Sequence, residues 1–126
     1  MSIDITLNKK HHYILGYYYG DVDLNDIRKF NTIIFQTFHE ITYDKLHVIA
    51  DVSEVNTHHI NATKAWEAIR KVAKHQKLGI VIVIGLKKPS IKFLIKLLAK
   101  LGGSDLRIVN THDDAIVMLE SLKVTI

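Results

Sequence analysis

Cysteine is absent from this sequence of 126 residues, proline occurs once, and glycine occurs only six times. The absence of cysteine excludes thiol catalysis, disulfide bonds and metal sites built on thiolates. So little proline and glycine leaves no flexible linker, and we expect one domain over residues 1–126. No apolar run approaches the roughly 18 residues of a transmembrane helix, and the N-terminus lacks the apolar core of a signal peptide. We therefore expect a cytoplasmic protein that is neither exported nor membrane-spanning.

Charge is distributed unevenly along the chain. Residues 1–63 carry five Lys or Arg against eight Asp or Glu, and residues 64–126 carry twelve against five. The halves are therefore −3 and +7, which sum to the net +4 of the chain. Such asymmetry indicates either solvated helix faces or an anionic partner. Zinc-finger spacing, an RNP-type aromatic strand and a helix-turn-helix pattern are all missing, so we expect no nucleic-acid partner.

Hydrophobic periodicity predicts the order of the elements. Ile3, Ile5 and Leu7 alternate with polar residues, and Asp21 or Asp23 is suited to cap the first helix. The predicted elements are a hairpin of strands Ile3–Leu7 and His12–Gly20, a helix from Leu24 to Ile41, a strand Leu46–Val52, a helix Ala62–Ala73, a strand Leu78–Leu86, a helix Ser90–Leu101, a strand Leu106–Asn110 and a helix Asp113–Lys123.

The predicted fold is therefore α/β, with the order β-β-α-β-α-β-α-β-α. Strands separated by helices favour a mostly parallel central sheet, with an antiparallel strand at one edge and the helices packed on the sheet. Three segments, YILGYYYGDVDLNDI, HVIADVSEV and IKFLIKLLAKLGGSDLRIVNTHDDAIVMLESL, resemble STAS domains. Within that superfamily the chain is similar to the STAS/SEC14-like branch and to the sporulation anti-sigma-factor antagonists. The resemblance implies a regulatory module that binds proteins.

One motif of these antagonists is not preserved. The family resemblance places an Asp-Ser-Ser/Thr-Gly motif, with a phosphorylated hydroxyl, just before the second helix. In this chain the motif falls on His59, Ile60, Asn61 and Ala62. Asn61 is a good N-cap, so we expect the helix to start there without a phospho-acceptor.

Polar candidates for a binding site follow the strands. The carboxyl ends of parallel strands share one edge of a sheet, where ligands usually bind. Helix N-termini near Asn61 and Ser90 favour an anionic group there; the alternative is that these are ordinary loop residues and caps. The candidates for this binding edge are Asp21, Ser53, Thr57, His58, His59, Asn61, Lys87, Lys88, Ser90 and His112.

Catalytic and metal-binding patterns are missing from the sequence. There is no GxSxG elbow, phosphate-binding glycine loop or GxGxxG motif, and no HxxxH or HExxH pattern among the eight histidines. Asp51 ends a predicted central strand, as in a receiver domain, but no acidic pair follows the first strand. We expect no enzyme, no metal site and no cofactor.

The predicted third helix has a wide apolar surface. Lys92, Lys96 and Lys100 occupy only a narrow arc of this helix, and apolar residues fill most of the remaining surface. A helix that packs on a sheet needs an apolar stripe little wider than ~100°. Phe93 or Leu97 at one margin of this surface, or Ile95 at the other, should therefore remain accessible unless another element covers it. A second subunit, a neighbouring helix or a lipid surface are the alternatives.

These features lead to two functional hypotheses. The first is a non-enzymatic regulatory or scaffolding module that pairs with a protein partner and forms a homodimer. The alternative is a carrier of a small hydrophobic or lipid ligand, as the SEC14-like resemblance implies. A carrier requires an apolar pocket between Tyr13–Tyr19, Phe30–Phe38 and the third helix.

Overall fold

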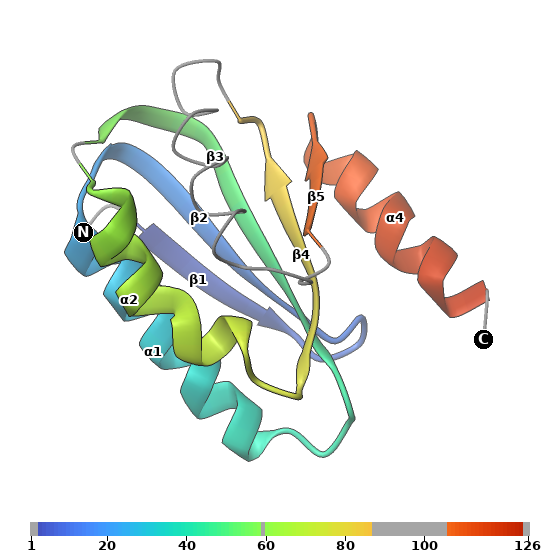
Figure 1. Ribbon diagram of the computed structural model, residues 1–126. Coiled ribbons are helices and arrows are strands. Elements are labelled where there is room, and N and C mark those ends of the chain that lie inside the picture. Colours follow the sequence, from blue (N-terminus) through green and yellow to red (C-terminus); the bar gives the residue numbers. More distant parts are fainter. Residues whose placement is uncertain (1–2, 59, 87–105, 125–126) are drawn as a thin grey trace.

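The computed structural model describes residues 3–58, 60–86 and 106–124 (Figure 1). Within these ranges the chain forms five strands and three helices: β1 (Ile3–Asn8), β2 (Tyr13–Val22), α1 (Leu24–Glu40), β3 (Leu46–His58), α2 (Ala62–Ala73), β4 (Leu78–Ile84), β5 (Leu106–Val109) and α4 (His112–Val124). The predicted helix Ser90–Leu101 lies outside the described residues. None of the helices that the structure describes is long and apolar enough to cross a membrane.

The five strands form one sheet in the order β1-β2-β3-β4-β5. β1 and β2 are antiparallel, and every other neighbouring pair is parallel. This arrangement confirms the predicted mixed sheet with an antiparallel edge strand. Because these pairs are parallel, the carboxyl ends of β2 to β5 point the same way (Figure 1).

The start of α1 is fixed by a capping box, in which two carboxylates and two backbone N–H groups pair reciprocally. The Asp23 side chain accepts a hydrogen bond from the Asp26 N–H at 3.1 Å, and the Asp26 side chain accepts one from the Asp23 N–H at 3.0 Å. Of the two residues predicted as caps, the structure selects Asp23. The helix ends where Ile41 becomes extended and donates its N–H to the Thr37 carbonyl.

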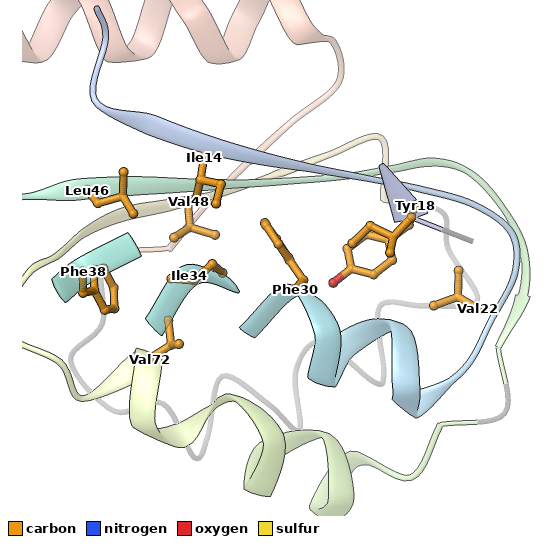
Figure 2. Packing of buried hydrophobic residues seen from close by; sticks show 10 residues of the cluster. Ile14, Tyr18, Val22, Phe30, Ile34, Phe38, Leu46, Val48 and Val72 are labelled. Carbon is orange, nitrogen blue, oxygen red and sulfur yellow. The ribbon is translucent and has the colours of Figure 1, made fainter. Parts of the chain in front are cut away.

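The two faces of the sheet are covered by different helices. α1 and α2 cover one face, where Ile14, Tyr18 and Val48 point toward α1 (Figure 2). On the opposite face α4 packs on β4 and β5, and its Ala115 and Leu119 join a second core cluster. Alternation along β2 separates the two clusters, because successive side chains of a strand point to opposite faces.

β3 is longer than the sequence indicated. We expected a strand that ends at Val52, followed by a polar loop, but β3 continues to His58. The polar residues after Val52 remain in the sheet because β2 pairs with them, with Tyr19 opposite Glu54 and Val22 opposite His58. β4 ends at Ile84, opposite Asp51, so β2 and β3 continue beyond β4 as a two-stranded ribbon (Figure 1).

Candidate functional site

The predicted binding edge divides into two parts because β3 extends beyond its neighbour. Ser53 lies at the level where β4 ends, next to Gly85. Thr57 and His58 lie at the tip of the ribbon, opposite Asp21 and Val22. Four residue steps of extended chain separate Ser53 from Thr57, which corresponds to roughly 13 Å at about 3.3 Å per residue. The candidate residues therefore do not form a single compact cluster.

The inner part is a closed contact between Asp51, Ser53 and Gly85. Asp51 Oδ1 accepts hydrogen bonds from the Ser53 hydroxyl at 2.6 Å and from the Ser53 N–H at 3.0 Å. Gly85 has φ +71°, and a Cβ added there would lie 2.5 Å from Ser53 Cβ. Glycine is required at this position for both reasons, because a side chain would be strained and would collide with β3.

The outer part combines the ribbon tip with the start of α2. Asn61 Oδ1 accepts hydrogen bonds from the N–H groups of Thr63 at 2.8 Å and Lys64 at 3.3 Å. This confirms Asn61 as the N-cap. Two backbone donors of the kind that bind anions at helix N-termini are therefore already paired with this side chain. Asn56, Asn61 and Thr63 are exposed, as are the charged residues Asp21 and Lys64, so this end of the molecule presents a polar surface.

The remaining candidates lie elsewhere. His112 is the first residue of α4 and is exposed, and Thr111 Oγ1 caps the helix by accepting from the Asp114 N–H at 3.2 Å. His112 follows β5, so it lies across the sheet from the ribbon tip. The candidates that lie outside the described residues are His59, Lys87, Lys88 and Ser90 of the binding edge, and Lys92, Phe93, Lys96, Leu97 and Lys100 of the predicted interface.

Two histidines have structural roles. His47 Nδ1 accepts a hydrogen bond from the Ile80 N–H at 3.0 Å, which ties β3 to β4. His75 Nδ1 accepts from the Lys77 N–H at 3.0 Å, and its ring stacks on Phe38 at 4.3 Å. Burial lowers the pKa of His75, and the neighbouring His39 and Lys77 lower it further. Among the residues described, no three His, Asp or Glu side chains are grouped so as to hold a metal ion.

Sequence reasoning did not identify a group of tyrosines and carboxylates on the sheet. Tyr18 packs against Phe30 in the core, so Tyr17 and Tyr19 point to the opposite face. The strand register places Asp4 and Asp51 on either side of Tyr17. The signal was present in the sequence as the alternation of Tyr17, Tyr18 and Tyr19, but the neighbouring carboxylates come from other strands.

Comparisons with known proteins identify the fold. No family model matches the chain, and no curated protein matches it. An uncharacterized protein of the DUF3478 family with a SpoIIAA-like fold, from Shewanella loihica PV-4, is 15% identical over 93% of this chain and 91% of its own, with a TM-score of 0.63. The anti-sigma factor antagonist SpoIIAA in its unphosphorylated form is 16% identical, with coverage of 94% and 97% and a TM-score of 0.56. A variant of RsbS from Moorella thermoacetica is 13% identical, with 98% coverage of both chains and a TM-score of 0.65. The chain therefore has a SpoIIAA-like STAS fold.

Proposed function

We propose that the protein is a non-enzymatic regulatory or scaffolding module that binds a protein partner through the ribbon tip and the start of α2. The fold supports this proposal, because SpoIIAA, which shares it, is an anti-sigma factor antagonist. The observation that carries the proposal is the Asn61 side chain. It caps the start of α2, but it has no hydroxyl group that could be phosphorylated. A protein of the same fold, SpoIIAA, occurs in a phosphorylated form. We infer that binding by the present chain is not switched by phosphorylation at the corresponding motif.

The local chemistry favours binding over catalysis. Asp51, the carboxylate that a receiver-type reaction would use, accepts two hydrogen bonds from Ser53. Both bonds are made to Asp51 Oδ1, so this oxygen already holds Ser53 in place. Asn56, Asn61 and Thr63 are exposed polar residues of the outer part, and they suit the polar rim of a protein interface.

The carrier hypothesis receives no support from the described part of its expected pocket. Phe30, Ile34 and Phe38 of α1 are each at most 3% exposed and pack directly on the sheet. The Phe30 ring lies against the backbone of Gly16, which leaves no room for a ligand between α1 and β2 at that point. Homodimer formation and a cytoplasmic location remain predictions from the sequence.

Site-specific photo-crosslinking tests this proposal. Benzoylphenylalanine in place of Asn56 or Thr63, both exposed, should crosslink the chain to one protein partner in the cells that produce it. The matched control carries the same photo-reactive residue in place of Glu120, which is exposed on α4 at a distance from the ribbon tip. Equal crosslinking from the control at position 120 would contradict the proposed surface. The absence of a protein adduct from both position 56 and position 63 would also contradict it.

A further inference from the structure

A second surface lies on the sheet face opposite α1 and α2. We call it the tyrosine face and define it by Asp4 of β1, Tyr17 and Tyr19 of β2, and Asp51 and Glu54 of β3. Asp4, Tyr17 and Asp51 are direct neighbours in the strand register, and Tyr19 is paired with Glu54. α4 packs on β4 and β5, so none of the described helices lies over this part of the sheet (Figure 1).

The two rings form an accessible aromatic platform. The centroids of Tyr17 and Tyr19 are 5.6 Å apart, with the ring planes tilted by 32°. Both side chains are partly exposed, although sheet residues at this level on the other face are buried in the core. Tyrosine offers a flat contact area at low cost in conformational entropy, which is why it is enriched in protein-binding surfaces.

Negative charge surrounds this platform. Asp4 and Glu54 are exposed, and Asp51 is half-buried. The pKa of Tyr17 is raised by loss of hydration and then by the charges of Glu54, Asp51 and Asp4. Strand alternation places Arg107 on the same face, but it lies on β5, three strands away from Tyr17. The negative potential at the two rings therefore disfavours anionic lipids and nucleic acids.

We propose that the tyrosine face docks a cationic segment of a partner protein, with arginine or lysine side chains over the rings and paired with the surrounding carboxylates. Arginine fits this arrangement best, because its planar guanidinium stacks on aromatic rings and donates to carboxylates in a fork. The inference goes beyond the ribbon-tip surface, and it rests on the proposed function only in that the partner is a protein.

The probe is a decapeptide of alternating arginine and glycine, titrated into the isotope-labelled protein and followed by NMR. We expect shifts at the backbone amides of the tyrosine face, and no binding of the matched glutamate–glycine peptide. The triple variant Asp4→Asn, Asp51→Asn, Glu54→Gln should weaken binding ~tenfold, because each exposed ion pair contributes a factor of about 1.5 to 5. Tyr17→Ala should weaken binding about threefold, as expected for an exposed cation–π contact.

The matched control is Glu40→Gln, Asp44→Asn, Glu67→Gln. It makes the same change in net charge with exposed residues of α1, α2 and the segment after α1. Equal weakening by both triple variants, or shifts distributed away from the tyrosine face, would overturn the proposal. Shifts of the same amides on raising the protein concentration without peptide would make a second copy the occupant and would also overturn it. Failure of crosslinking at the ribbon tip would leave this result unchanged, so the two surfaces are tested separately.

Discussion

The Phe30 ring lies directly against the backbone of Gly16, so that a Cβ on Gly16 would come within 2.6 Å of Phe30 Cε2. α1 and β2 are therefore in close contact at the centre of the larger core cluster (Figure 2). Side chains of ordinary size pack at greater distances, so this contact depends on the absence of a side chain on the strand. It also limits the space in which any ligand between α1 and β2 would have to lie.

The substitution Gly16→Ala should lower the free energy of unfolding by about 1–3 kcal/mol, which is the usual cost of overpacking a core. Phe30 is almost fully buried in the larger core cluster, so its ring has little room to move aside. Urea denaturation of the two proteins measures the difference.

The control is the double variant Gly16→Ala, Phe30→Leu. If the steric account holds, the second change should cost less in the Gly16→Ala background than alone, since the smaller side chain relieves the collision. Strictly additive effects would contradict it.

The Asn61 cap should contribute about 1 kcal/mol to stability, because Asn61→Ala leaves two N–H groups of α2 without their side-chain acceptor. Asn61→Asp should instead increase the free energy of unfolding by about 0.3–1 kcal/mol. The reason is that the first turn of α2 contains no acidic residue, so a carboxylate there would gain from the helix dipole. Chemical denaturation at pH 7 distinguishes the two variants, and destabilisation by both would argue against a simple capping role.

Stability should fall as the pH is lowered from about 6.5, the ordinary pKa of histidine, toward the lowered pKa of His75 in the folded protein. In this range the unfolded chain binds a proton that the folded chain does not, so protonation favours unfolding. Above this range the contribution of the neutral ring is fully present.

His75→Asn preserves an acceptor for the Lys77 N–H but cannot titrate. We therefore expect a flatter dependence of the unfolding free energy on pH between 7.5 and 5.5 for this variant than for the wild type. Parallel curves for the two proteins would show that His75 does not account for the dependence.

The predicted third helix gives a test of self-association that depends on the sequence alone. If Leu97 lies at a dimer interface, Leu97→Glu should yield a folded monomer, because a charge in an apolar interface is poorly solvated. Light scattering after size exclusion gives the mass, and circular dichroism reports the fold. An unfolded variant would place Leu97 in the core, and an intact dimer would exclude this helix as the interface.

The order of the elements could be predicted because each has a clear local signal. The alternation in β1, the helical spacing of Phe30, Ile34 and Phe38 in α1, and the continuous apolar run of β4 each identify one element without its neighbours. Asn61 was recognised in the same way, since a cap depends on residues within one turn.

The length of β3 and the shape of the binding edge could not be predicted, because they depend on neighbouring strands and not on a local signal. Residues Ser53 to His58 carry no strand pattern of their own, and they are extended because β2 pairs with them. The ribbon then separates candidates that the sequence placed together. The contact between His75 and Phe38 likewise joins the segment after α2 to α1, and no local pattern predicts it.

Native mass spectrometry of the tagged chain, isolated gently from the cells that produce it, tests the proposed protein-binding role most directly. If the chain is a protein-binding module, it should carry additional mass of many kilodaltons above its own 14.4 kDa, and this mass should decrease when Asn56 and Thr63 are both replaced by arginine. A chain that carries only a few hundred daltons of extractable small molecule would contradict this account and would support the carrier hypothesis.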